Sequence, residues 1–231
     1  MVSITSYSTV SSSVSSMSQA QSTQQTASSS STTQTDETSS SSSSNVSTLA
    51  SQLAAAAERA EVRDATLSLK ELAQKAKSLL NQITGMGYYN SRAASDEEVP
   101  DTDNEELLAR AEQATDFVNG KGSNPFKGLS SEQLTLIIYD DSGTFTTNER
   151  RAAFSADYDL KEMWNQKVVA QANIEQATTG NSTNFYKACL DYYNNEPLIK
   201  QVQYDDDYAT NLQKRIDQST SSSTTDNSLA Q

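Results

Sequence analysis

Apolar residues recur every three or four positions along most of this chain, and this spacing limits what it can fold into. The pattern begins at Leu49 and Leu53 and returns in several later segments. Such spacing is typical of one buried helix face, whereas a half-buried strand needs sustained alternation of apolar and polar residues, which this sequence lacks. We therefore predict an all-α fold, a small irregular or orthogonal helical bundle with disordered Ser/Thr-rich tails at both ends.

Both ends of the sequence are poor in apolar side chains. Residues 1–45 are almost wholly Ser, Thr and Gln, with no Lys or Arg and with Asp36 and Glu37 as the charged residues. Such a segment buries too little apolar surface to offset an ordering cost of about 1 to 2 kcal/mol per residue. We predict a disordered tail over residues 1–45, a helical domain over residues 46–218 and a second disordered tail over residues 219–231.

Within the domain, the spacing and the turn residues place individual helices. One or two helices cover residues 48–83, and further helices are predicted at 103–119, 130–139, 147–178, 183–194 and 208–217. The run between residues 88 and 103 is rich in charge and predicts a mobile acidic loop, and the long helix is expected to break near residues 156–159. In the short helix 130–139, we expect Thr135 to face solvent. Three side chains are expected to face the core: Leu134, Ile137 and Ile138.

The charge balance excludes several classes of partner. Lys and Arg number 17 against 30 Asp and Glu, so the net charge is −13 and the pI about 4.4. A field of this sign repels phosphate backbones, so no nucleic-acid partner is expected. No window approaches the roughly 18 apolar residues of a membrane-spanning helix, so no membrane insertion is expected. The first residues lack the basic and apolar regions of a cleaved signal peptide, which leaves a cytoplasmic protein or one exported by another route.

The sequence argues against an enzyme. It contains no histidine, which removes the usual general base and the histidine-containing nucleophilic triads. The one cysteine, Cys189, lies in a helical pattern where a small buried thiol is the ordinary interpretation. We assign no catalytic and no cofactor-binding residue. An enzyme that works with carboxylates alone, such as Asp205 and Asp207, remains a third hypothesis.

One segment, residues 134–153, carries a local motif. An apolar run stops at the acidic turn, which begins at Asp140 and includes Gly143, and a helical pattern resumes after Thr146. This segment resembles an EF-hand, whose loop holds oxygen ligands at its first, third, fifth, seventh, ninth and twelfth positions and a glycine at the sixth. With Gly143 as the sixth residue, the resemblance implies a Ca²⁺ site with ligands Asp140, Ser142, Thr144, Thr146 and Glu149.

The match has one clear departure and one competing interpretation. Ile138 stands at the first loop position, where the family has an aspartate, and the EF-hand-like unit spans only about residues 130–156. Without any metal, Thr146 and Glu149 form the S/T-x-x-E pattern of a helix capping box, and Gly143 supplies a positive φ. Both interpretations use the same residues, so the sequence leaves them open.

Taken together, these features favour a non-enzymatic acidic helical protein that interacts with a protein partner or has a structural role. The Ser/Thr-rich start is similar in composition to the export signals of type III and flagellar secretion substrates, which are threaded unfolded through a channel. That resemblance implies export without a cleaved signal peptide, and a flexible solvated spacer is the alternative. A calcium-binding EF-hand-like regulatory module is the second functional hypothesis.

Overall fold

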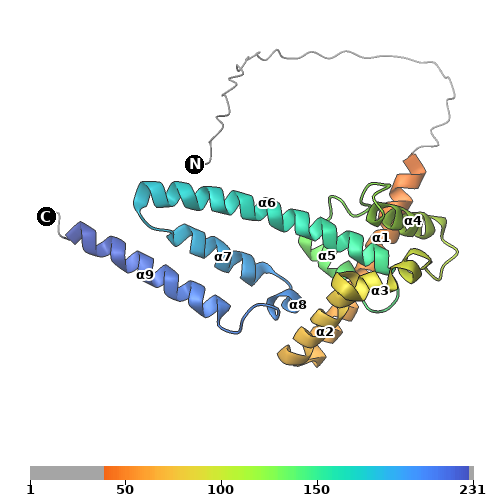
Figure 1. Cartoon of the computed structure of the whole chain (residues 1–231), viewed down its shortest axis with the longest axis horizontal. Coiled ribbons are helices and arrows are strands. Elements are labelled where there is room, and N and C mark those ends of the chain that lie inside the picture. Colours follow the sequence, from red (N-terminus) through yellow and green to blue (C-terminus); the bar gives the residue numbers. More distant parts are fainter. Residues whose placement is uncertain (1–38, 229–231) are drawn as a thin grey trace, which may run out of the picture. The chain divides into compact units, whose positions relative to one another are not determined.

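The computed structural model describes the backbone of residues 39–228 and the side chains of residues 48–220, and in this part of the chain every regular element is a helix (Figure 1). The predicted all-α fold is therefore confirmed. The described residues all belong to one compact unit. The helices are α1 (Ser39–Thr66), α2 (Leu69–Ile83), α3 (Gly85–Asp96), α4 (Glu105–Val118), α5 (Ser131–Ile138), α6 (Thr147–Thr179), α7 (Thr183–Asn195), α8 (Leu198–Gln201) and α9 (Tyr208–Ser228).

Local sequence signals set many of the helix ends. Ser68 caps α2 and forms a capping box with Glu71, and Ser130 forms the same motif with Gln133 at the start of α5. In each case the two side chains satisfy backbone N–H groups that have no partner inside the helix. Gly180 ends α6 with a φ of 71°, a conformation that costs glycine little.

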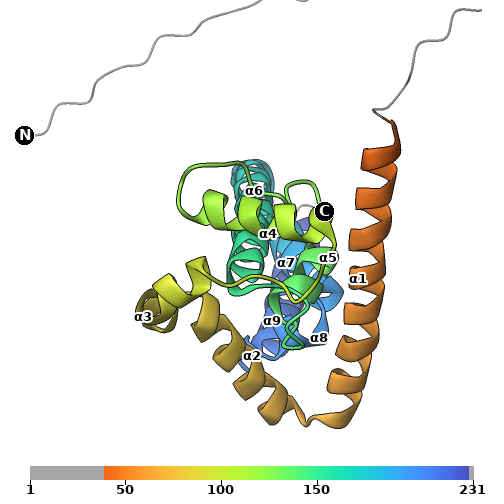
Figure 2. The same ribbon diagram turned by 90° about the vertical axis from the view of Figure 1, so that its right-hand side faces the viewer.

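The main core lies between α1, α2, α5 and the first half of α6. Figure 2 shows α1 and α2 diverging from their connection, and α5 contacts both α1 and α6. Alanines on α6 allow close approach of the neighbouring helices, and Phe126 from the loop before α5 is completely buried. The largest buried apolar side chains of this core are Leu72, Ile83, Phe126, Leu134, Ile137, Ile138 and Ile199.

The predicted acidic loop at residues 88–103 is wrong over its first part, because α3 continues to Asp96. Gly85 has a φ of 58° and lets a new helix start directly after α2. Tyr88 is 1% exposed, and the Arg151 guanidinium lies 4.0 Å from the centre of its ring. Beyond α3, the carboxylate of Glu98 accepts a hydrogen bond from the backbone N–H of Thr147 at 2.8 Å, so the remaining loop contacts the start of α6.

Asn148 joins three helices at the first turn of α6. Its Oδ1 accepts a hydrogen bond from the Tyr88 hydroxyl at 3.0 Å. Its Nδ2 donates to the backbone oxygen of Ser95 at 3.1 Å, to Asp96 Oδ1 at 3.0 Å and to Thr115 Oγ1 at 3.1 Å. Because the side chain is completely buried, these bonds replace the water that an amide otherwise binds.

Two further expectations for the helices are wrong. Thr135 is 3% exposed rather than solvent-facing, and its hydroxyl donates to the backbone oxygen of Ser131 at 2.7 Å, which satisfies it inside the core. The predicted break at residues 156–159 is absent, because α6 runs without interruption through a segment that contains neither glycine nor proline.

Three segments pack against one another in what we call the C-terminal arm: residues 158–179 of α6, α7 and α9. In the arm α7 contacts both other helices (Figure 1). No residue of α7 is buried, and among the side chains described in the arm the buried apolar ones are Val168, Leu212 and Ile216. Partly exposed aromatic pairs supply much of the remaining packing, among them Trp164 with Tyr192 at 4.1 Å between ring centres.

The structure describes the backbone of part of both predicted tails. Residues 39–45 lie in α1 and residues 219–228 lie in α9, because extending an existing helix adds a backbone hydrogen bond for each residue ordered. Residues 1–38 and 229–231 of the predicted tails lie outside the described residues. Among the described helices, none has the length and apolar character that crossing a bilayer requires.

Candidate functional site

The acidic turn that resembles an EF-hand connects α5 to α6. The end of α5 is capped at Tyr139, and α6 begins at Thr147. Gly143 has a φ of 84°, and a side chain at this position would meet no atom within 4 Å. The glycine is therefore required by the backbone conformation and not by crowding.

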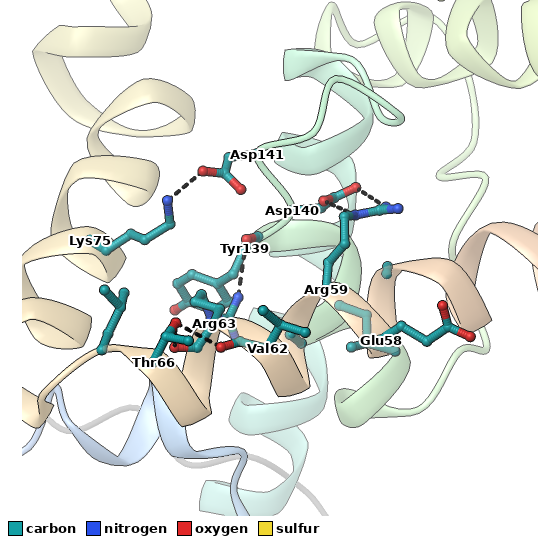
Figure 3. A pocket seen from close by; sticks show the side chains of 13 residues that line it. Glu58, Arg59, Val62, Arg63, Thr66, Lys75, Tyr139, Asp140 and Asp141 are labelled. Carbon is teal, nitrogen blue, oxygen red and sulfur yellow. Dashed lines mark hydrogen bonds and ion pairs between the residues drawn. The ribbon is translucent and has the colours of Figure 1, made fainter.

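Asp140, the third loop position, is held by an arginine from α1. Arg59 Nε donates to Asp140 Oδ1 at 3.0 Å and Nη2 donates to Oδ2 at 2.8 Å, a two-pronged ion pair (Figure 3). The Ser142 hydroxyl also donates to Oδ2 at 2.9 Å, and the Ser142 N–H donates to Oδ1 at 3.3 Å. Asp140 is 7% exposed, and the Arg59 guanidinium balances the charge of its carboxylate.

Ser142 and Thr144 continue the same polar cluster at the surface. Their hydroxyl oxygens lie 2.7 Å apart, and the Thr144 hydroxyl also accepts from Arg59 Nη2 at 3.3 Å. The structure therefore brings three of the five predicted calcium ligands together: Asp140, Ser142 and Thr144. The guanidinium of Arg59 occupies the position of their shared cationic partner.

Thr146 and Glu149 form a separate cluster at the start of α6. The Thr146 hydroxyl accepts from the Glu149 N–H at 3.2 Å, and Glu149 Oε2 accepts from the Thr146 N–H at 2.8 Å, so the predicted capping box is present. Glu149 Oε1 accepts from Arg110 Nε of α4 at 2.7 Å. The Arg110 guanidinium also lies 5.7 Å from the ring centre of Phe126 and 5.4 Å from that of Phe145.

The five predicted ligands thus divide between two arginines from different helices. Glu149 is completely buried with both oxygens engaged, and the backbone oxygen of Ile138, at the first loop position, accepts from Arg150 Nε at 3.0 Å. Among the described residues, no group of three or more Asp, Glu, Cys or His side chains is arranged to hold a metal ion. A calcium ion at this turn would have to displace Arg59 from Asp140 and Arg110 from Glu149, so calcium binding remains a prediction from the sequence.

A cavity of about 550 Å³ lies beside the turn, between α1, α2 and α5. Figure 3 shows Lys75 paired with Asp141 and Arg63 directed at the backbone oxygen of Tyr139, a contact of 3.3 Å. The hydrogen bond from Lys75 lowers the pKa of Asp141 below its usual value. The cavity lining contains equal numbers of basic and acidic side chains, and the ion pairs of Asp140 with Arg59 and of Asp141 with Lys75 hold the turn against α1 and α2.

Sequence reasoning did not identify Arg59 and Arg110 as members of this region. Arg59 lies 81 residues before Asp140, and Arg110 lies 39 residues before Glu149. Spacing along one helix carries no information about such distant pairs. Two weaker candidates also have ordinary surroundings: Asp205 and Asp207 are exposed, and burial raises the pKa of the half-buried Cys189 thiol.

Comparison with known proteins adds no functional assignment. No family model matches the sequence, and neither the curated proteins nor the solved structures give a match.

Proposed function

We propose that this protein is a non-enzymatic, acidic helical interaction protein that docks a protein partner on its C-terminal arm. The supporting observation is the set of large apolar side chains that α6 leaves exposed in the arm. Tyr158 is 60% exposed, Met163 59%, Val169 50% and Ile174 66%. The helical repeat places Met163 and Ile174 on one side of α6 and Tyr158 and Val169 on another. We take the side of Met163 and Ile174 as the docking surface, since exposed apolar side chains that share one side of a helix favour a partner there.

The packing of the arm supports the same proposal. The buried core cluster draws its α6 members from Ala152, Ala153 and Ala156, all before the arm begins. Because α7 has no buried residue, the arm gains less from apolar burial than the main core does. A partner that covers Met163 and Ile174 would bury apolar surface in the arm, where the chain's own packing buries little.

The chemistry of the described residues also favours binding over catalysis. The sequence has no histidine, and the pKa of Cys189 is raised by burial, so this thiol is a poor nucleophile near neutral pH. The carboxylates of the acidic turn are engaged by Arg59, Lys75 and Arg110 in structural contacts. These contacts hold the turn against α1, α2 and α4. The helix α6, which follows the turn, continues into the arm.

A site-specific photo-cross-linking experiment tests this proposal. A photoreactive amino acid is placed at Met163 or at Ile174 in the full chain, with Lys70 on the exposed face of α2 as the matched control position. We expect cross-links to a protein from the native source at the two arm positions and none at Lys70. Equal labelling at all three positions, or none on the arm, would contradict a docking surface there.

Substitutions provide the second half of the test. Met163→Gln and Ile174→Gln change exposed side chains, so each should alter the free energy of unfolding by less than about 0.5 kcal/mol. We expect both variants to lose partner binding while their thermal melts stay unchanged. A loss of binding that accompanies a lower melting temperature would point to the fold rather than to the surface.

Export directed by the N-terminal segment is a separate part of the proposal, and the Ser/Thr-rich composition of residues 1–45 supports it. Deletion of this segment should leave the helical domain folded, because the described apolar contacts of α1 with the core lie at Leu49, Leu53 and Ala56. The deleted protein should no longer appear outside the producing cells. If it is secreted as before, the segment is a spacer and not an export signal.

A further inference from the structure

The docking surface on α6 is a narrow stripe in which large and small side chains follow a definite order. Five residues lie within about 40° of one line along the helix, and all five are exposed: Met163, Lys167, Ala170, Ile174 and Ala177. The other side of α6 is occupied within the chain. There the Trp164 ring contacts Tyr192 of α7, and Glu175 accepts the backbone N–H groups of Asn184 and Phe185. Because α7 packs on that side, it leaves the docking surface uncovered.

The charge of the docking surface differs from that of the protein as a whole. Lys167 is its charged residue, whereas the chain carries a net charge of −13. Asp159 lies one turn before the start of the stripe, and Glu162 and Glu175 point about 100° or more away from its centre. Two copies of the chain can therefore meet at this surface without placing carboxylates against each other. A basic partner, in contrast, finds no carboxylate within the stripe.

We propose that the docking surface binds a second copy of this chain, with the two α6 helices antiparallel about a twofold axis beside Ala170. A twofold interface must be self-complementary, because the same surface is used on both copies. Met163 and Ala177 each lie seven residues from Ala170, so each Met163 is level with the small Ala177 of the second copy. The inference rests on the proposed function, since it names the partner that docks on the C-terminal arm.

The remaining side chains of the docking surface fit the same arrangement. Ala170 meets Ala170 of the second copy, and two small side chains at the axis allow the helices to approach closely. Lys167 lies three residues before the axis and Ile174 four residues after it, so the two lie almost level across the interface. The methylene stem of Lys167 can cover Ile174 of the second copy while its ammonium group stays in water.

The size of the docking surface predicts a weak dimer. The stripe is one helix wide and about 21 Å long, at 1.5 Å per residue, and it offers two large apolar side chains per copy. Such an interface lies at the small end of specific contacts, so we expect a dissociation constant on the order of 100 µM. The net charges of two copies repel each other, and salt screens this repulsion. Added salt should therefore strengthen the dimer.

The test is sedimentation velocity of the full chain from about 1 µM to about 1 mM, in about 50 mM and about 500 mM NaCl. We expect a monomer at the lowest concentration, a rising share of dimer above about 100 µM, and at least twofold tighter association at the higher salt concentration. A monomer throughout, or a dimer that dissociates when salt is added, would overturn the proposal.

A charge placed at the axis tests which surface is used. Ala170→Glu brings two carboxylates together at the axis and should weaken the dimer at least tenfold. The matched control is Ala54→Glu on the exposed face of α1, which adds the same charge away from the docking surface and should weaken it less than twofold. Equal weakening by the two substitutions would show that total charge, and not this surface, controls the association.

Engineered disulfides test the arrangement of the helices. Cys189 is first replaced by serine, because it is the one cysteine of the chain. Ala170→Cys should then form a disulfide-linked dimer on mild oxidation, since residue 170 lies beside its own copy at the axis. Val169→Cys, exposed on another side of α6, should remain largely monomeric on a non-reducing gel. Linkage of both variants at the same rate would contradict the antiparallel pairing.

The outcomes also separate this inference from the docking proposal on which it rests. Photo-cross-links from Met163 and Ile174 to a different protein, with a chain that stays monomeric in sedimentation, would overturn the second copy as partner and keep the docking surface. The absence of any cross-link from these two positions would remove both proposals. Cross-linked dimers of the chain, together with the expected salt effect, would support both.

Discussion

Replacing Glu149 with glutamine separates a structural role of the acidic turn from a calcium-binding one. In the structure Glu149 is completely buried, accepts the N–H of Thr146 and pairs with Arg110. An amide keeps the shape but carries no charge, and it presents one donor where both oxygens now accept. We therefore expect Glu149→Gln to destabilise the metal-free protein.

The magnitude follows from the two contacts. A lost helix cap costs about 1 kcal/mol, and a hydrogen bond to a charged group contributes about 1.5 to 3 kcal/mol. Together they predict a loss of about 3 kcal/mol in the free energy of unfolding, with Arg110 left without a charged partner. For a domain of this size, that loss corresponds to a melting temperature lower by about 6 to 12 °C.

The assay is a thermal melt followed by circular dichroism, in excess EDTA and then in millimolar Ca²⁺ with Mg²⁺ as the control ion. Glu112→Gln, on the exposed face of α4, is the matched substitution and should melt with the parent. Because Arg59 and Arg110 hold the carboxylates, we expect no calcium-specific shift in the parent, whereas a ligand at 100 times its dissociation constant would add about 2.7 kcal/mol. An unchanged melt of Glu149→Gln in EDTA, with a calcium response lost, would refute the structural interpretation.

Three further measurements test other parts of the fold. Asn148→Asp places an acceptor where Nδ2 donates three hydrogen bonds, one of them to Asp96. Urea unfolding should therefore show a loss of about 3 kcal/mol or more in the free energy of unfolding. An equal loss in the exposed control Asn194→Asp would contradict this. Gly143→Ala should cost about 1 kcal/mol in the same assay, since φ is 84° with open space around it, and no cost would mean that the turn relaxes. Burial raises the pKa of Tyr139 from 10.0 to about 12, so the stability that its protonated hydroxyl contributes is complete below about pH 10 and is lost as the pH rises toward 12. Urea unfolding at both ends of this range should show a smaller alkaline loss in Tyr139→Phe, and an identical loss would show that this tyrosine is not responsible.

Most of the helical architecture could be predicted, because its signals are local. The capping pairs that start α2 and α5 lie within four residues of the helices they begin, and glycine marks the end of α6. The missed helix α3 shows the limit of this reasoning. Its buried face consists of Tyr88 and Ser95, too few apolar residues for a visible period, and it is fixed by hydrogen bonds to Asn148 of α6.

In the acidic turn, too, the local contacts could be predicted from the sequence and the contacts with distant helices could not. Gly143 and the Thr146–Glu149 capping box were visible in the sequence because they act within a few residues of one another. The sequence did not reveal which cation pairs with Asp140 and Glu149, because a metal ion and a distant arginine are both suitable partners for a carboxylate. The packing of α1 and α4 against the turn brings Arg59 and Arg110 to these two carboxylates.

The sequence by itself therefore determined the all-α class, the main helices and the chemistry of each helix end, since backbone hydrogen bonds and caps join residues that are close along the chain. Only the tertiary structure decided which charges meet. It paired Asp140 with Arg59 across the core, and it brought Lys200 to both Asp157 and Glu196. Such contacts depend on how whole helices pack. The spacing of residues along one segment does not show which buried charges will be paired.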